Sequence, residues 1–537
     1  MFATARVKTG ISTARTVGSA FAAPPLSQSP AAKRRCLALH AMAPPSVRRA
    51  VVWFRNDLRV HDNYALHEAA KLASAGRVGE VLPLYVFDPH YFSETEWGSV
   101  KTGARRAAFV LGSVLDLKRR LRDVGSDLVV AVGRPEEVVA RAAGEAATVV
   151  VQDETTSEER RAVGRVREAV GRSGGKVVSV WGSTLYHRDD VPFRGDMQDM
   201  PDSFSKYRQA VEGVAPVRPL LEGSSVCAGP LPKQLPEGLS YEFEPGWRDI
   251  PFTSETDEPT FDRRGVLDFQ GGETAALERL KYYLWDSKLL STYFDTRNGM
   301  LGGDYSTKFA PWLAHGCLSP RRVFWEIKEY EKQFGDNKST YFAGFHLIVR
   351  DYWKFFAVRH GNGIFRGRGV AGNNVVWAAQ DEQQERFQRW VEGKTGMPLV
   401  DANMRELAAT GFMSNRGRQN VASYLCLDLE VDWRRGADHF EHHLLDYDVA
   451  SNWGNWVAAA GLTPGRVNRF NITKQSKDYD AQGDYIRHWV PELKDVPASR
   501  IHEPWSATVE ERAAMEGLDI YPRPMVEPPV HVPRKKR

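Results

Sequence analysis

The chain has 537 residues, too many for a single hydrophobic core, so at least two domains are expected, and its composition is that of a globular protein with an unusual total of 15 tryptophans. The formal net charge is +4, but residues 1–56 contain nine Lys or Arg and no acid, so the rest of the chain carries −5. That balance excludes a protein that binds nucleic acid through its overall charge and leaves only a local basic patch for such a role.

Residues 1–47 are rich in Ala, Ser, Thr and Arg and contain no acid, which is typical of an organelle transit peptide; the alternative is a disordered tail. We expect import into the chloroplast, with the mitochondrion as the alternative and the nucleus, suggested by the closing PRKKR, less favoured. No stretch is long and apolar enough to span a membrane. The four cysteines form no Cys-x-x-Cys pair, so neither a metal site nor a disulfide framework is expected.

Residues 48–190 alternate between strand-like and helix-like stretches. Short apolar runs rich in β-branched residues have the pattern of strands buried on both faces, at 51–54, 81–87, 128–132, 148–151 and 177–181. Helix-like stretches such as 104–122 and 136–145 lie between them. This order predicts an α/β, Rossmann-like domain with a parallel sheet and right-handed crossovers. No glycine-rich phosphate motif follows any strand, so a dinucleotide held by such a turn is not expected.

The remaining chain changes character twice. Prolines recur between residues 191 and 267, which predicts an interdomain linker with one short helix at 204–213. From 268 to 505 apolar residues recur at helical spacing, which predicts a larger, all-helical domain. One of its helices is expected to take Asp401 as its N-cap and to end at Gly411. Residues 506–537 are expected to form a basic-ended tail.

One stretch, residues 432–456, combines carboxylates, an amide and indoles. Asp446, Asp448 and Asn452 lie between Trp433 and Trp456. Tryptophan is rarely left in water, and a buried Asp or Asn needs hydrogen-bond partners. A planar heterocycle with ring N–H and C=O groups, such as a flavin, would stack on the indoles and satisfy the polar groups. The alternative is a solvated turn beside ordinary core tryptophans.

These residues resemble the flavin motif of photolyases and cryptochromes, and the sequence NWGNW is similar to that of DASH-type cryptochromes. The opening VVWFRNDLRVHDN also resembles the photolyase N-terminal signature, although its charged residues could form a structural salt-bridge set. The resemblance implies an N-terminal antenna domain followed by a helical FAD-binding domain. It also places Glu154 near an antenna pigment, usually a folate such as methenyltetrahydrofolate; otherwise Glu154 is a favourable partner for a helix dipole.

The resemblance further implies an FAD site built from several segments. Arg350 would contact phosphate or flavin, or else form an internal ion pair with Asp351 or another carboxylate. Ala310 departs from the family, which commonly has a serine there. The implied FAD-binding residues are Tyr293, Ser306, Thr307, Lys308, Phe309, Arg350, Arg418, Asp446, Asp448 and Asn452, with Arg418 paired to Asp446.

Two further sets of residues follow from the resemblance. Trp456, Trp433 and Trp377 correspond to the tryptophan relay that passes electrons to excited flavin. His346, Asn415 and Gln419 correspond to the lesion pocket of repair enzymes, and the two amides suit the reading of base edges. In that pocket His346 stands where a glutamate is usual, while Val349 and Ala458 replace stacking tryptophans.

Two functions therefore compete. The first is a blue/UV-A photoreceptor that binds single-stranded nucleic acid and signals to an unknown protein partner. The second is a photolyase that splits cyclobutane pyrimidine dimers in single-stranded DNA, where extrusion of the lesion costs least. The altered pocket favours the photoreceptor. A basic patch around Phe470 and Tyr479 could hold DNA or RNA, although a solvated loop explains it equally well: Arg466, Arg469, Lys474 and Lys477. We expect a monomer.

Overall fold

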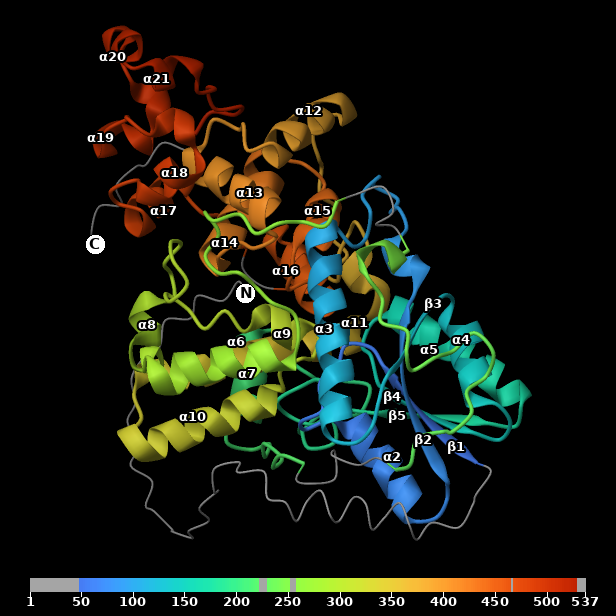
Figure 1. The fold of residues 1–537 in the computed structure, drawn as a ribbon. Helices are drawn as coiled ribbons and strands as arrows, with labels where there is room; N and C mark the ends of the chain where they lie inside the picture. The colour runs from blue at the N-terminus through green and yellow to red at the C-terminus, as the bar shows by residue number, and fades with distance from the viewer. Residues whose placement is uncertain (1–47, 222–228, 252–256, 465–466, 529–537) are drawn as a thin grey trace.

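The computed structural model describes residues 48–221, 229–251, 257–464 and 467–528. Figure 1 shows a parallel sheet with flanking helices on one side of the molecule and a larger group of helices on the other. The expected transit peptide and the closing PRKKR lie outside the described residues. No helix in the described part of the chain combines the length and the apolar character that crossing a membrane requires.

The N-terminal domain is the predicted α/β domain. Its five parallel strands are arranged in the order β3-β2-β1-β4-β5. They form because runs such as Val51–Phe54 are almost fully buried on both faces, which suits β-branched side chains. The elements are β1 Arg49–Phe54, α2 Tyr64–Ser74, β2 Glu80–Phe87, α3 Ala104–Asp123, β3 Val129–Val132, α4 Pro135–Ala143, β4 Thr148–Gln152, α5 Ser157–Arg172 and β5 Lys176–Val180.

The second domain is helical, as expected, and follows a stretch of mostly irregular chain that contains α6 (Phe204–Val211). Its longest helix, α11, lies centrally and contacts both α10 and α16. The helices are α7 Glu273–Lys281, α8 Tyr293–Thr296, α9 Ala310–Ala314, α10 Pro320–Phe334, α11 Lys338–His360, α12 Gln380–Val391, α13 Pro398–Thr410, α14 Asn415–Ser423, α15 Trp433–His443, α16 Val449–Ala459, α17 Ile472–Tyr479, α18 Asp484–Trp489 and α19 Ala498–Ile501.

The start of α13 differs from the prediction. The helix begins at Pro398, and Met397 rather than Asp401 is its N-cap. Proline at the first helical position supplies the right φ and lacks an N–H that would need a partner. Asp401 lies one turn further on, is fully buried, and accepts the backbone N–H of Thr395 at 2.8 Å. The other end is confirmed, because Gly411 ends the helix with a φ of +70°.

The described residues after 505 are also helical in part. They form α20 (Val509–Ala514) and α21 (Glu516–Ile520), and Leu518 and Tyr521 are buried. The Tyr521 hydroxyl donates to the carboxylate of Asp401, 120 residues earlier. This segment therefore packs against α13 of the helical domain.

The two domains meet through buried polar contacts. Asp62, in the loop after β1, lies 2.6 Å from Arg321 of α10, and the two side chains are 1% and 2% exposed. Gly316 has a φ of +71°, and a Cβ there would lie 2.1 Å from the carbonyl oxygen of Asn56. A glycine therefore allows the loop after β1 to approach the helical domain this closely.

Gly316→Ala is expected to lower the free energy of unfolding by about 3 kcal/mol or more, because overpacking is added to left-handed backbone strain. Gly76→Ala is the matched control, since its φ is +64° and no atom lies within 4 Å of the added Cβ. It should show the backbone strain alone, about 1–2 kcal/mol. Urea unfolding measures both variants, and equal losses would contradict the importance of this interdomain contact.

Candidate cofactor site

A cavity of about 490 Å³ lies within the helical domain, between α8, the loop before α9, α11, α14 and α16. Most residues implied by the resemblance lie on its wall, although they come from distant parts of the chain. Trp433, Trp377 and Glu154 are not among the residues that line it. Those that do are Tyr293, Ser306, Thr307, Lys308, Phe309, His346, Arg350, Asn415, Arg418, Gln419, Asp446, Asp448, Asn452 and Trp456.

Asp448 joins α16 to α11. Its carboxylate caps α16 by accepting the Ser451 N–H at 2.9 Å, and it lies 2.6 Å from the Lys354 ammonium. Burial opposes ionisation, but Lys354 and Arg350 outweigh it and bring the pKa of Asp448 down to about 2. The carboxylate is therefore ionised at neutral pH. Lys354 was not predicted, although its position four residues after Arg350 places it on the same helix face.

Asp446 forms the expected pair with Arg418. The guanidinium Nη2 of Arg418 lies 2.9 Å from the Asp446 carboxylate, and its Nε donates to the Met413 carbonyl at 3.0 Å. Both side chains lie on the cavity wall. The pair fixes a carboxylate at the start of the α16 segment and leaves it able to accept further hydrogen bonds.

Arg350 has protein partners, as the alternative reading proposed. It donates to the backbone carbonyls of Ser183 and Leu313 and lies 4.0 Å from Asp448. The neighbouring Asp351 is not its ion-pair partner; that carboxylate accepts the backbone N–H groups of Leu185 and Tyr186 at 2.9 and 2.8 Å. Arg350 still lines the cavity, so a phosphate or flavin edge would be an additional contact.

Tyr293 and His346 form a hydrogen-bonded pair on the wall. The Tyr293 hydroxyl oxygen lies 2.7 Å from Nδ1 of His346. Burial, with Arg297 nearby, lowers the pKa of His346 to about 3. The imidazole is therefore neutral at physiological pH and offers one donor and one acceptor. Among the other lining residues, Asn415 begins α14 and is exposed, whereas Gln419 is buried and accepts from Arg416 at 2.7 Å.

The turn before α9 carries hydroxyl groups and a buried lysine. Lys308 has a φ of +61°, and its ammonium donates to the Ser306 hydroxyl at 3.0 Å. Burial lowers the pKa of Lys308 well below its ordinary value. An anionic ligand at this turn would favour the charged ammonium, which suits the diphosphate expected beside Ser306 and Thr307.

The tryptophans of the expected relay occupy three different settings. Trp456 lies on the cavity wall and packs against α15, where a Cβ on Gly436 would lie 2.3 Å from its ring. Trp433, one turn before Gly436 on α15, is fully buried. Trp377 is partly buried in the chain before α12. The first two indoles are therefore held close to the same turn of α15.

Two residues of the cavity wall carry buried polar atoms without a partner in the described part of the chain. The Asn455 carbonyl oxygen and the Trp353 indole N–H are buried without a hydrogen-bond partner among the described residues, and both residues line the cavity. Such orphaned atoms are costly in a closed protein interior. The carboxylates of Asp446 and Asp448, just before α16, are the acceptors on the wall that suit the ring N–H groups of a flavin. The burial of these two atoms was not predicted from the sequence.

Glu154 is placed at the domain interface and not on the cavity wall. It is 5% exposed and accepts from the Asn56 side-chain amide at 3.3 Å. Burial raises its pKa to about 7, with Lys354 and Arg55 opposing the shift. The Glu154 carboxyl group is therefore buried and partly protonated at neutral pH. Its position near an antenna pigment remains a prediction.

The expected basic patch is largely neutralised. Arg469 lies 2.6 Å from Asp428, while Lys474 and Lys477 pair with Asp478 and Glu503. Arg466 lies outside the described residues. In the described part of the chain no group of three or more His, Cys, Asp or Glu side chains is arranged to hold a metal ion.

Comparisons with known proteins agree with this geometry. Residues 50–223 match the family model for DNA photolyase, and residues 343–534 match that for the FAD binding domain of DNA photolyase. Cryptochrome DASH, chloroplastic/mitochondrial, of Ostreococcus tauri is 50% identical over 501 residues, which is 89% of this chain and 90% of that protein. A cryptochrome structure from Synechocystis is 44% identical with a TM-score of 0.82, over 90% of this chain and 98% of that one. A class III photolyase structure from Agrobacterium tumefaciens is 25% identical with a TM-score of 0.72, and the match covers 90% of this chain and 96% of that one.

Lys354→Met is expected to lower the free energy of unfolding by about 3 kcal/mol at pH 7, because it leaves the buried Asp448 carboxylate without its ammonium partner. The folded-state pKa of Asp448, about 2, lies below the ordinary 3.8. The ion pair therefore contributes fully above pH 4 and is lost as the pH falls toward 2. The difference between the two proteins should narrow over that window.

The control is Lys332→Met on α10, whose side chain is 62% exposed and should change stability by less than about 0.5 kcal/mol. Urea unfolding between pH 3 and pH 7 measures all three proteins. A gap that stays constant with pH would contradict the role assigned to Asp448.

Proposed function

This chain belongs to the DASH cryptochromes of the cryptochrome/photolyase family, and from that premise we propose that it is a photoreceptor in which blue or UV-A light drives reduction of bound FAD. Its match to the FAD-binding domain makes it a flavoprotein. The supporting observation is the placement of Trp456 on the cavity wall, packed on the same turn of α15 that carries Trp433. An excited cofactor in the cavity would have an oxidisable indole in the wall around it.

Bound FAD supplies an electron acceptor when it is excited by light. The protein's own groups hold it and control protons. Asp446 and Asp448 are fixed as carboxylates by Arg418 and Lys354 and can accept ring N–H groups. Asn452 donates its amide N–H to the Ala437 carbonyl at 2.9 Å, which leaves its carbonyl oxygen as an acceptor. An amide has no acidic proton to give, so it favours retention of reduced flavin.

Dimer repair in single-stranded DNA is the second candidate function. It is favoured by the overall similarity to a class III photolyase and by the placement of His346, Asn415 and Gln419 on the wall of the same cavity. Val349 lines the cavity where repair enzymes of the family have tryptophan, and Ala458 replaces another. Base stacking contributes about 1–3 kcal/mol per aromatic ring, so losing two rings lowers lesion affinity by roughly 30-fold to 20,000-fold. This loss favours the photoreceptor.

The remaining assignments follow the relatives. The Ostreococcus protein is named chloroplastic/mitochondrial, which supports organelle import here, and we favour the chloroplast. A folate antenna beside Glu154 and single-stranded nucleic-acid binding belong to the same proposal. Because Arg469, Lys474 and Lys477 are paired with acids, binding should be weak.

Replacing Trp456, Trp433 and Trp377 together by Phe keeps aromatic bulk and removes the oxidisable indoles. The altered protein should retain FAD through gel filtration, while its photoreduction under blue light should slow by about tenfold or more. Absorbance of the bound flavin during illumination measures this rate. Trp325→Phe, at a partly exposed position on α10, is the control. Wild-type kinetics in the triple variant would reject the relay.

The two functions are separated by a repair assay on dimer-containing single-stranded DNA. The unaltered protein should repair slowly, and His346→Glu should repair faster, because it restores a carboxylate to the pocket. His346→Gln tests polarity without charge and should not gain activity. Efficient repair by the unaltered protein would make the photolyase the better description.

A further inference from the structure

Trp453 is a buried indole that the expected relay does not include. It follows Asn452 on α16 and is 9% exposed. Its ring contacts that of Trp433, with centroids 5.7 Å apart and planes at 78°. An electron vacancy on Trp433 would therefore have a second tryptophan in direct ring contact.

The indole N–H of Trp453 faces a base. Its Nε1 lies 3.3 Å from Oε2 of Glu441 and 3.2 Å from the Tyr447 hydroxyl. The indole N–H of Trp433, in contrast, is buried without a hydrogen-bond partner among the described residues. Loss of an electron makes an indole cationic and its N–H acidic, so a neighbouring carboxylate both stabilises the charge and can take the proton. Of the two rings, Trp453 is the one equipped to be oxidised.

Glu441 lies in a mixed electrostatic environment that suits a base. Lys101, from the chain before α3, lies 3.6 Å from its Oε1, and Arg106 of α3 and Glu158 of α5 also act on it. Burial raises the pKa of Glu441, and the two cations oppose this shift. The carboxyl group is therefore a stronger base than an exposed glutamate and remains held by Lys101.

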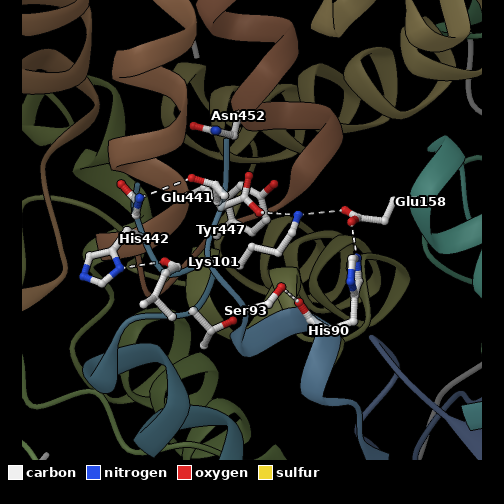
Figure 2. Close-up of polar contacts among 12 residues, drawn as sticks. His90, Ser93, Lys101, Glu158, Glu441, His442, Tyr447 and Asn452 are labelled. Atoms are coloured by element: carbon white, nitrogen blue, oxygen red, sulfur yellow. Dashed lines mark hydrogen bonds and ion pairs between the residues drawn. The ribbon is translucent and has the colours of Figure 1, made fainter. Parts of the chain in front are cut away.

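The same cluster continues toward the surface. Lys101 bridges Glu441 and Glu158, which lies 3.0 Å away, and Glu158 contacts His90, whose side chain is 45% exposed. Figure 2 shows this series of side chains running from His90 past Lys101 to Glu441 and Tyr447, with Asn452 beyond them. A proton received by Glu441 has titratable neighbours between it and solvent.

We propose that Trp453 and Glu441 form a proton-coupled branch of the electron relay, in which Trp453 is oxidised and Glu441 accepts its indole proton. The proposal rests on the light-driven flavin reduction proposed above. An electron passes from Trp453 to the vacancy on Trp433, the N–H bond of Trp453 breaks, and an O–H bond forms on Glu441. The products are neutral Trp433, a neutral indolyl radical on Trp453 and a carboxylic acid, so electrons, protons and charge balance.

The alternative is that these contacts only join the two domains. Flash spectroscopy of the FAD-loaded protein distinguishes the two cases, because the neutral indolyl radical absorbs at shorter visible wavelengths than the indole cation. The unaltered protein should form the neutral radical. Glu441→Gln should retain the cation, and Trp453→Phe should lose the neutral radical, with the yield of separated charge falling about tenfold or more in each.

Trp390→Phe is the matched control. Its ring also contacts a relay tryptophan, Trp456, with centroids 6.2 Å apart, but its N–H donates to the Val421 carbonyl and no carboxylate can take the proton. This variant should behave as the unaltered protein does. An effect as large as that of Trp453→Phe would overturn the proposal, since any buried indole would then serve.

Light-minus-dark infrared spectra test the unaltered protein directly, so the main result does not depend on whether a variant folds. A new carboxylic-acid C=O band that shifts in D2O is expected, and its absence from Glu441→Gln would assign it. If Trp456 and Trp433 are oxidised but no such band or neutral radical forms, the branch is wrong while the relay stands. If no tryptophan is oxidised in the unaltered protein, both the branch and the photoreceptor proposal fall.

Discussion

The ion pair between Lys354 and Asp448 fixes the start of α16, which forms one wall of the cavity, against α11. Asp448 is both the N-cap of α16 and the partner of a buried ammonium on α11, so the start of one helix is fixed relative to the middle of the other. Asn452 and Trp456 follow one and two turns later on α16. The contact between Lys354 and Asp448 at the start of α16 therefore determines where the Asn452 amide and the Trp456 indole lie on the cavity wall.

Glycines determine how closely the aromatic rings lie against the helices. A Cβ on Gly436 would lie 2.3 Å from Trp456, and one on Gly454 would lie 2.5 Å from Trp353. Each indole thus rests on a bare helix backbone instead of on a side chain. The cavity keeps its shape because large planar groups fill the space that two missing Cβ atoms provide. Overpacking at either glycine would move a ring that lines the site.

Much of this architecture could be predicted from the sequence because it depends on local periodicity. Buried strands such as 51–54 and 81–87 are recognisable from continuous β-branched runs, and the structure extends them by only one or two residues. The start of α13 was wrong because Pro398 overrides a capping preference at Asp401. Lys354 and Glu441 were missed because their partners, Asp448 and Trp453, are chosen by helix packing. The partner of Arg350 was left open for the same reason, since nothing near it in sequence identifies Asp448.

The contact between Tyr521 and Asp401 has a consequence for how the chain is made. The two residues are 120 positions apart, and Asp401 also holds the turn that precedes α13. At about 5–20 residues per second, the ribosome takes roughly 6 to 24 seconds to reach Tyr521 after it has added Asp401. Throughout that interval the nascent helical domain presents a carboxylate without its tyrosine partner. Tyr521, directly after α21, therefore completes the hydrogen bonds of Asp401 only after most of the helical domain has been synthesised.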